Sequence, residues 1–555
     1  MSFQTVALMV SLLGAWSSGQ DAASLKHTTE AGRLAPLLDN LGNLHVPVTT
    51  SSDDTQRYFD QGMRLIYAFN HAEALRSFRE AARNDDHCAM AYWGQALALS
   101  PNINDSAIGP DREQQGHDAI REAVKRRTSA SEKEQALIDA LQARFAANVS
   151  AGERVKMNAA YARAMLGVWS RFPKDPDVAT LYADAVMNTR PWDYWTKDGK
   201  PQPGIADARA ALEQTIRLYP DHPGAHHMYI HLMEASDEVD LAVPSADRLG
   251  QLMPGAGHLV HMPSHIYIRV GRYEDAAAAN IKAIAADEDY ITQCRAQGIY
   301  PALYYPHNTH FLAAVLAMEG RSTDALQAAR TVASQHGHDA ADEGLLGFAH
   351  LLRALPMMTM VRFGHWEAIE REAAPAADWP FVRSIYHFGR GMAFSASARP
   401  ALAETELGLS EQQASHPENK KIKILDLNSL ADIAQIGIWI LRGDIAEKAG
   451  RNEEAITAFQ RAVTLEDGLL YSEPPDWFIP PRQYLAQAYM AAGEPAEAER
   501  VYREDLKRHR QNGWSLRGLE QSLRKQGKQA EANRVHEEFR RAWQWADVQL
   551  AASRF

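Results

Sequence analysis

Histidine is concentrated in one stretch of this 555-residue chain. Nine of the 22 histidines lie between residues 222 and 310, namely His222, His226, His227, His231, His258, His261, His265, His307 and His310. Neutral imidazole is the commonest metal ligand near neutral pH, and it can also move protons. The stretch is therefore a candidate metal centre.

The spacing inside this stretch is helical. At about 100° per residue, side chains three or four positions apart share one face of a helix. Three one-sided stripes follow this rule: His227, His231 and Glu234; then His258, His261 and His265; then His307 and His310. We expect the seven imidazoles to be metal ligands. We expect Glu234 to be a further ligand, an orienting group or a catalytic base.

A repeat is visible around these stripes. Glycine followed five residues later by alanine recurs at Gly271–Ala276, Gly320–Ala325, Gly450–Ala455, Gly493–Ala498 and Gly527–Ala532. Gly493 and Gly527 are 34 residues apart, and near the start Tyr58, Gly62 and Phe78 follow a similar small and large order. The chain thereby resembles the tetratricopeptide repeat family over most of residues 55–540.

The resemblance implies an all-α fold. It would be a tetratricopeptide-type α-solenoid of antiparallel helix pairs, superhelical with a concave groove. Three strings, Cys88–Gly94, His258–His265 and Tyr502–Leu506, are similar to a histidine-rich, exported group of bacterial tetratricopeptide proteins with no settled activity. This likeness implies the fold and little about function.

The repeat register connects the stripes. With Gly271 as position 15 of a repeat, Gly257 is position 1, and Pro223 and Pro306 begin the neighbouring units. The stripes then fall at positions 5, 9 and 12, at 2, 5 and 9, and at 2 and 5. In the family these positions of the first helix face the groove. The resemblance therefore implies that all three stripes meet there.

The ligand set favours copper over zinc or iron, because it holds many imidazoles and one carboxylate. Seven imidazoles exceed the four ligands of one tetrahedral zinc ion, so a dinuclear site is possible. We expect an oxidoreductase that uses O₂ on a small organic substrate in the groove, by analogy with the ligand sets of type 3 dicopper proteins. Tryptophans in two proline-rich insertions are expected to line the substrate side: Trp192, Trp195 and Trp477.

Two other functions stay open. One is a non-catalytic scaffold that binds peptide or protein partners, and the other is a zinc-dependent hydrolase using Glu234. A zincin protease is disfavoured because Met228 stands where its glutamate should be, between His227 and His231. Pro263 lies inside the second stripe, so we expect a kink or a separate turn there.

Composition and the N-terminus limit partners and location. The net charge is −12, and no basic patch or nucleic-acid motif stands out, so we expect no nucleic-acid partner. The apolar run Val6–Leu13 is too short to span a bilayer, and small residues follow it. It predicts a secretory signal peptide and an exported, periplasmic or secreted protein without a membrane span.

These observations divide the chain into five parts. We expect a signal peptide at 1–23, an N-terminal extension at 24–54, tetratricopeptide-like repeats at 55–222, central histidine-rich repeats at 223–345 and C-terminal repeats at 346–555.

Overall fold

The computed structural model describes residues 32–106, 108–146, 149–294, 300–335 and 345–555. The chain divides into two compact units. Unit 1 is Met1–Ile266 with Ile281–Tyr305, and unit 2 is Tyr267–Asn280 with Pro306–Phe555. The predicted signal peptide at 1–23 and the first part of the predicted extension lie outside the described residues.

Unit 1 is built from α-helices and three short helical turns. Its helices are α2 (Asp53–Tyr67), α3 (His71–Asn84), α4 (Ala89–Leu99), α5 (Pro110–Arg126), α6 (Glu132–Gln142), α7 (Ala151–Arg171), α8 (Pro176–Met187), α9 (Ile205–Leu218), α10 (Pro223–Met233), α11 (Val243–Leu252) and α12 (Gly257–His261). The turns are η2 (Arg127–Ser129), η3 (Val239–Ala242) and η4 (Tyr300–Tyr304). Two helices, α13 (Pro263–Val270) and α14 (Tyr273–Cys294), are divided between the units, and α15 (Tyr305–Met318) belongs to unit 2 except for its first residue, Tyr305.

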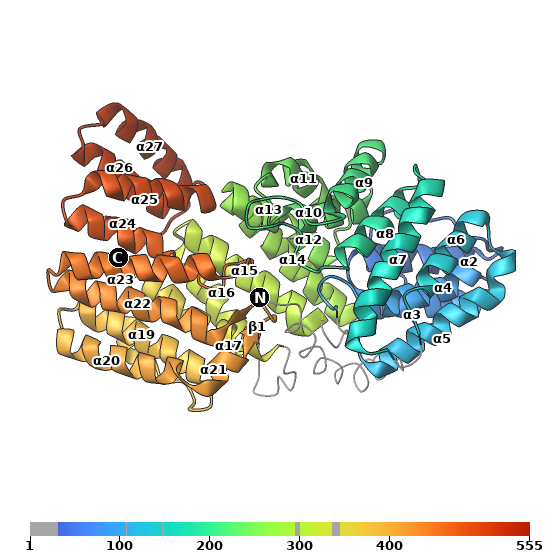
Figure 1. Ribbon diagram of the computed structural model, residues 1–555, viewed down its shortest axis with the longest axis horizontal. Coiled ribbons are helices and arrows are strands. Elements are labelled where there is room, and N and C mark those ends of the chain that lie inside the picture. The colour runs from blue at the N-terminus through green and yellow to red at the C-terminus, as the bar shows by residue number, and fades with distance from the viewer. Residues whose placement is uncertain (1–31, 107, 147–148, 295–299, 336–344) are drawn as a thin grey trace. The chain divides into compact units, whose positions relative to one another are not determined.

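Unit 2 continues the same construction (Figure 1). Its helices are α15 (Tyr305–Met318), α16 (Ser322–Gln335), α17 (Leu346–Arg362), α18 (Trp366–Arg371), α19 (Pro380–Ala396), α20 (Pro400–Ala414), α21 (Pro417–Lys421), α22 (Leu430–Lys448), α23 (Asn452–Gly468), α24 (Pro481–Ala491), α25 (Pro495–Arg508), α26 (Gly513–Lys525) and α27 (Gln529–Ala542). The strands β1 (Lys423–Ile424) and β2 (Asn428–Ser429) pair antiparallel.

Local sequence determines where many helices begin and end. Proline stands in the first turn of α8, α10, α24 and α25, where a missing backbone N–H costs little. In α6, Ser131 and Glu134 form a reciprocal capping box. Gly271 and Gly493 end first helices with φ of 81° and 82°, a conformation that glycine adopts without steric cost. The glycines that revealed the repeat are therefore the turns between paired helices.

Packing between pairs depends on small residues facing large ones. In unit 1 the buried ring of Phe78 on α3 lies against Gly62 on α2 and Gly94 on α4. A Cβ atom on either glycine would overlap the ring. The order of small and large residues in the sequence therefore corresponds to one packing contact. In it the Phe78 ring fits between two glycines, and this lets the three helices approach one another.

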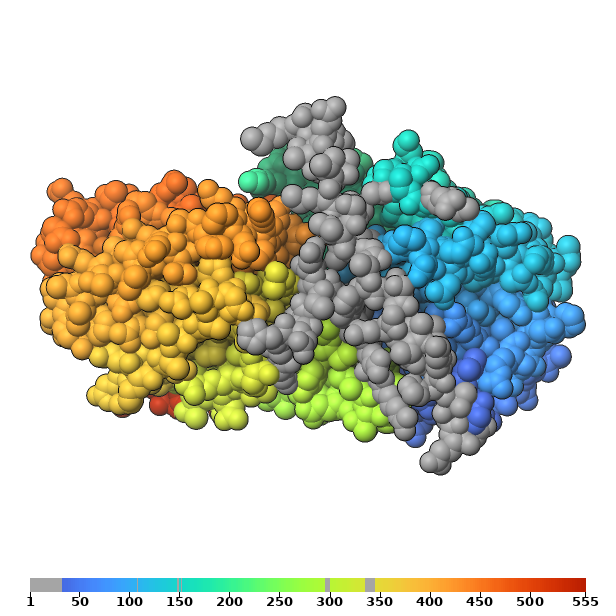
Figure 2. All heavy atoms as spheres, turned by 90° about the horizontal axis from the view of Figure 1, so that it is seen from below, coloured from blue at the N-terminus to red at the C-terminus, as the bar shows by residue number. Residues whose placement is uncertain are grey.

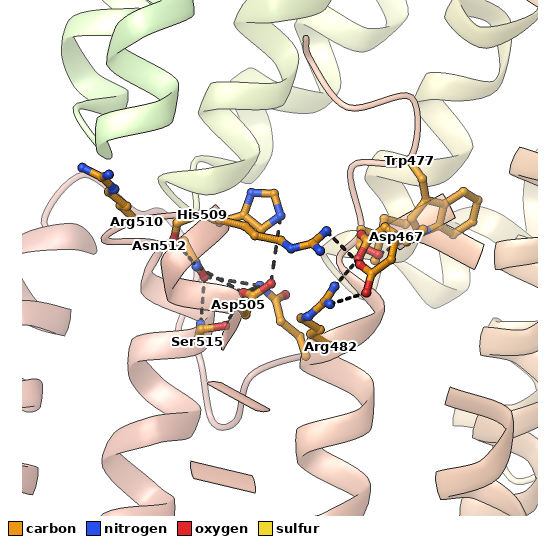
Figure 3. Close-up of polar contacts among 12 residues, drawn as sticks. Asp467, Trp477, Arg482, Asp505, His509, Arg510, Asn512 and Ser515 are labelled. Carbon is orange, nitrogen blue, oxygen red and sulfur yellow. Dashed lines mark hydrogen bonds and ion pairs between the residues drawn. The ribbon is translucent and has the colours of Figure 1, made fainter. Parts of the chain in front are cut away.

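In unit 2 the helices from α19 to α23 present a continuous outer surface of side chains, coloured yellow to orange in Figure 2. Polar contacts join the end of α23 to the start of α24, and α25 to the start of α26 (Figure 3). Asp505 accepts a hydrogen bond from the Ser515 hydroxyl at 2.6 Å, and Arg482 pairs with Asp467 at 2.7 Å. Asn512 caps α26 by accepting from the Ser515 backbone at 2.9 Å. These contacts fix neighbouring repeats without further apolar area.

The predicted all-α fold of antiparallel, tetratricopeptide-type helix pairs is confirmed. Within the described ranges, β1 and β2 are the only strands, and each has two residues. No helix in the described part of the chain combines the length and apolar character that a membrane crossing requires.

The contact between Gly62 and Phe78 can be tested by substitution. Gly62→Ala should lower the free energy of unfolding by about 1–3 kcal/mol, because the new methyl group overpacks the ring. Gly167→Ala is the control, since Gly167 is an exposed glycine inside α7 with open space around its Cα. It should stabilise by up to about 1 kcal/mol through helix propensity. Urea unfolding followed by circular dichroism measures both, and an equal effect of the two changes would contradict the packing.

Candidate metal centre

Helix α10 carries the first histidine stripe. His222 caps the helix by accepting a hydrogen bond from the Ala225 backbone at 3.0 Å, and Pro223 begins it. His227 and His231 follow one helical turn apart, and both are buried. The predicted one-face arrangement of this stripe is therefore present in the structure.

The second stripe is divided between two helices. His258 and His261 lie on α12, which ends at His261, and His265 lies on α13, which begins at Pro263. Proline has no backbone N–H and restricts the residue before it, here Met262, so the chain breaks at this point. Of the two arrangements expected at Pro263, the separate turn is the one adopted.

Three imidazoles from α10 and α12 converge. One ring nitrogen from each of His227, His231 and His258 lies within 4.8 Å of the other two. The Nε2 atoms of His227 and His258 are 3.1 Å apart. Metal–nitrogen bonds of about 2.0–2.1 Å in a tetrahedral site separate two ligand nitrogens by about 3.3 Å. The His227 and His258 nitrogens are thus close to the spacing that one ion requires, and the His231 nitrogen lies within 4.8 Å of both.

Contacts at Nδ1 determine which nitrogen points inward. The Nδ1 of His227 lies 2.6 Å from the backbone carbonyl oxygen of Tyr67, so this nitrogen must be the N–H donor. The Nδ1 of His231 lies 3.3 Å from Oε1 of Glu234, and the same reasoning applies. In both rings Nε2 then carries the lone pair. Histidine ligands of metal ions are oriented by the same kind of contact.

A hydrogen bond between imidazoles is the simpler explanation of one short distance. If Nε2 of His258 donated to Nε2 of His227, that pair would be satisfied. The Nε2 of His231 would remain buried, and it has no hydrogen-bond partner among the described residues. An unsatisfied buried acceptor costs about 1–3 kcal/mol. A bound cation would satisfy the inward lone pairs of His227 and His231, whereas Nδ1 of His258 is buried without a hydrogen-bond partner among the described residues in either arrangement.

The three rings are neutral and thus ready to act as ligands. Burial is the main cause that lowers the pKa of His227 and His258 well below its usual range, and neighbouring imidazoles lower it further. Burial also lowers the pKa of His231, although Glu234 opposes it. A neutral imidazole keeps the lone pair that a metal ion requires.

Glu234 links the two stripes. Its carboxylate lies 3.3 Å from Nδ1 of His231 and 2.8 Å from Nδ1 of His265, and it is fully buried. Burial alone raises the pKa of Glu234, but electrostatic interactions and hydrogen bonds with His265 and His231 outweigh this and lower it. A buried carboxylate that stays ionised needs positive charge nearby. A cation held by the imidazoles would supply it.

A second imidazole pair adjoins Glu234. The Nε2 atoms of His261 and His265 are 2.9 Å apart, and Nδ1 of His261 lies 3.3 Å from the hydroxyl of Ser264. Because Nδ1 of His265 faces the carboxylate, its Nε2 carries the lone pair toward His261. This pair has the same pattern of an anchored outer nitrogen and an inward Nε2.

Two nearby histidines serve the scaffold. Both ring nitrogens of His226 are occupied, by the Ser245 hydroxyl at 3.0 Å and the Pro220 carbonyl at 2.8 Å. The ring of His222 contacts Asp177 at 3.2 Å in addition to its capping role. Neither of these two rings directs a nitrogen at the group formed by His227, His231 and His258.

Comparison with known families bears on the repeats. Residues 436–468 and 485–513 match two family models described as Tetratricopeptide repeat. These segments contain the turns at Gly450 and Gly493 and the helix pairs α22–α23 and α24–α25. The chain contains tetratricopeptide repeats in unit 2. It matches no protein of curated function.

Solved structures give weak likenesses to this chain. The Cut9–Hcn1 hetero-tetramer of the APC/C matches with 14% identity over 88% of this chain and 76% of that one, at a TM-score of 0.30. Human IFIT1 bound to m7Gppp-AAAA matches with 12% identity over 89% and 96%, at 0.33. Yeast Tom70 matches with 12% identity over 88% and 91%, at 0.28. Such low TM-scores carry no argument about function.

Sequence reasoning missed Phe69, which forms the apolar wall of the histidine group. Its ring stacks on His231 and His258 at interplanar angles of 12° and 23°, and lies 4.5 Å from the His227 ring. Phe69 lies in the turn between α2 and α3 with φ of 59°. Gly271 holds the equivalent position in the turn between α13 and α14. That conformation costs a bulky residue about 1–2 kcal/mol. An aromatic residue in a glycine position was the available signal.

The two predicted tryptophans of unit 1 have different surroundings. The Trp192 ring meets the His231 ring edge-on at 5.3 Å, and its Nε1 donates to the Ile103 carbonyl at 3.0 Å. Trp192 is also 38% exposed, so it reaches from solvent to the histidine group. Trp195 donates to the Leu232 carbonyl at 2.7 Å and holds the insertion against α10.

The remaining predicted residues lie in unit 2. His307 and His310 are on α15, where His310 is buried edge-on against Phe348 and His307 lies edge-on to Phe311. Trp477 is buried, and its Nε1 donates to the Ile479 carbonyl at 2.7 Å. These three residues are therefore placed by the packing of unit 2. Their role as ligands or lining stays a prediction.

Burial of His310 predicts acid sensitivity. An unfolded histidine titrates near pH 6.5, whereas burial lowers the pKa of His310 to about 4. As pH falls between these values, the unfolded chain binds a proton that the folded chain does not, so stability decreases. With a metal chelator present, lowering the pH from about 7.5 to about 5 should reduce the unfolding free energy of the wild type by about 2 kcal/mol more than that of His310→Gln. Urea unfolding at both pH values measures this, and equal losses would contradict it.

Proposed function

We propose that this chain is a tetratricopeptide scaffold whose central histidines bind a transition-metal ion. The observation that carries the proposal is the convergence of ring nitrogens from His227, His231 and His258, with the outer nitrogens of His227 and His231 held by a carbonyl and a carboxylate. Oriented, neutral and buried imidazoles are what a metal site in a helical protein requires.

The ligand roles follow from the contacts. His227, His231 and His258 are the proposed first ligands, and Phe69 shields them from water. Glu234 is proposed to orient His231 and His265 because its two oxygens face their Nδ1 atoms. The same contacts disfavour a zinc hydrolase in which Glu234 is the base, because a base needs an oxygen free to take a proton.

Copper is the proposed ion, because three imidazoles without a thiolate suit copper or zinc and the larger set has one acid for many histidines. The finer proposal is an oxidoreductase that uses O₂ on a small organic substrate reaching the site beside Trp192. Oxygen consumption by the copper-loaded protein with simple phenols tests it. Uptake that persists in His258→Gln would contradict a reaction at this site.

Scaffolding of a protein or peptide partner is the second proposed function. The two matched repeats in unit 2 favour it, because stacked helix pairs of this kind present extended binding surfaces. Metal binding and partner binding are compatible, since they concern different residues.

Metal content of matched variants tests the first function. Mature protein without a histidine tag should retain about one copper or zinc ion per chain after loading and desalting, measured by mass spectrometry. His227→Gln or His258→Gln should reduce this to less than about a tenth, because each removes a ligand from the converging group.

His226→Gln is the control for these variants. His226 is the neighbour of His227 on α10 and is equally buried, but both of its ring nitrogens have protein partners. It should keep the ion while losing some stability. Loss of metal in His226→Gln alone, or retention in His258→Gln, would mean that the ligand set is wrong.

A separate prediction concerns the carboxylate. Glu234→Gln should weaken metal affinity about 10- to 100-fold, because the amide no longer polarises the two imidazoles. Glu213→Gln is its control, since Glu213 pairs with Arg209 and Tyr229 in the same unit. Competition titration against a chromophoric chelator gives both affinities. An unchanged affinity in Glu234→Gln would show that the carboxylate does not act on the ligands.

A further inference from the structure

The chain after α27 turns back along unit 2. In Figure 1 the last helices α24 to α27 form a stack, and the C-terminus is marked beside α23 and α24 and not beyond α27. Residues 546–555, here called the return segment, lie against the first helices of three successive repeats, α26, α24 and α22. The segment makes hydrogen bonds and ion pairs with side chains and backbone groups of unit 2.

The start of the return segment is held by backbone recognition. The Asp547 carboxylate accepts hydrogen bonds from the backbone N–H groups of Ser322 at 2.6 Å and Thr323 at 2.9 Å, at the beginning of α16. The helix dipole favours a carboxylate at this place. The Asp547 backbone N–H donates to the Gly320 carbonyl at 3.2 Å.

The middle of the segment is read through its backbone. Arg517 Nε donates to the Leu550 carbonyl at 3.1 Å, and Gln521 Nε2 donates to the Ala551 carbonyl at 2.5 Å. Side chains that bind main-chain carbonyls in this way recognise a peptide irrespective of its sequence. Ser553 instead contacts unit 2 through its side chain: its hydroxyl donates to the Gln483 backbone carbonyl at 3.0 Å and lies 2.8 Å from the Tyr502 hydroxyl on α25.

The end of the segment is read through side chains. The Arg554 guanidinium pairs with Asp444 at 2.7 Å and Glu447 at 3.0 Å, and it lies 4.7 Å from the centre of the Tyr484 ring. The Arg554 side chain is only 7% exposed and that of Asp444 only 2%. A buried arginine with two carboxylates and an aromatic face is a selective contact for a guanidinium.

The contacted residues share one repeat register. Counting the turn glycines Gly450, Gly493 and Gly527 as position 15, five of the contacted residues fall at positions 5, 9 and 12 of the first helices, and the Tyr484 ring is at position 6. The residues are Arg517 and Gln483 at position 5, Gln521 and Asp444 at position 9, and Glu447 at position 12. Positions separated by three or four residues lie on one helix face. Side chains on one face of α26 and of α22 therefore bind the segment, and α24 between them contributes the Gln483 backbone carbonyl and the Tyr484 ring.

We propose that this surface of unit 2 is a binding site for a peptide segment, and that the return segment occupies it as an internal ligand. The partner it fits is a non-helical, bent segment with small residues followed by an arginine beside an aromatic residue, as in Ser553, Arg554 and Phe555. The proposal builds on the scaffold function and is independent of the metal site. It identifies the surface, the chemistry of its partner and the element that keeps the surface closed.

Closure by a tethered segment is strong because the segment is always present. A segment linked to its own site competes at an effective concentration of about 1 mM. An external peptide at micromolar concentration therefore does not displace it. Weakening the Arg554 contact opens the surface, since a reversed charge there is repelled by Asp444 and Glu447.

The experiment uses the full chain and a fluorescein-labelled peptide with the sequence of residues 546–555. Binding followed by fluorescence anisotropy should be saturable for Arg554→Glu and at least about tenfold weaker for wild type. The same peptide carrying the R554E change should not bind the opened chain. Arg541→Glu, the same charge reversal on the exposed surface of α27, should behave as wild type.

Two results would overturn the proposal: no binding of the native peptide to folded Arg554→Glu, or equal binding to Arg554→Glu and wild type. If Arg554→Glu loses helicity by circular dichroism, Arg554→Gln removes the charge alone and is measured in its place. Metal content is measured on the same samples. Failure of the peptide to bind with metal retained contradicts the internal ligand only, and loss of metal with peptide bound contradicts the metal site only.

Discussion

Each helix pair of this chain can bury its apolar face only against the next pair, and this requirement determines which residues can vary. Contacts such as Phe78 between Gly62 and Gly94 use small residues so that helices approach closely. The positive φ of the turn glycines returns the chain for the next pair. Positions of the first helices that take no part in this packing can carry other side chains.

The histidine group shows how a buried polar cluster is tolerated in such a stack. Each imidazole has two nitrogens that need partners, and burial removes water as a partner. Tyr67 and Glu234 satisfy the outer nitrogens of His227 and His231, and this leaves the inner lone pairs directed at one another. Mutually facing acceptors are unfavourable unless a cation lies between them. The strained backbone at Phe69 adds a further cost of a kind that recurs at functional sites.

The sequence predicted the parts of this arrangement that are periodic. Helix pairs, turn glycines and the one-sided stripe of His227, His231 and Glu234 all follow from spacing along one helix. It could not predict that Glu234 faces His231 and His265 together, because that contact joins two helices. The separation of α12 from α13 at Pro263 was one of two expected outcomes, since a proline interrupts hydrogen bonding without specifying the new direction.

Long-range contacts were beyond local reasoning for the same cause. Phe69 reaches the histidines across more than 150 residues of chain, and nothing in its neighbourhood specifies that partner. The return segment has no periodicity at all, so only its chemistry, an arginine among small residues, is visible in the sequence. Its partners Arg517, Gln521 and Asp444 nevertheless lie at positions 5 and 9 of first helices, which are positions that the family resemblance assigns to the groove.

The same register positions therefore carry two kinds of chemistry in one protein. In unit 1, positions 5, 9 and 12 of α10 are His227, His231 and Glu234, and these side chains face one another across a few ångströms. In unit 2, position 9 and position 12 of α22 are Asp444 and Glu447, and they face a guanidinium. Position 12 is a glutamate in both cases, yet one orients imidazoles and the other pairs with Arg554. The repeat backbone determines where these side chains lie, and the neighbouring segment of the chain determines what they bind.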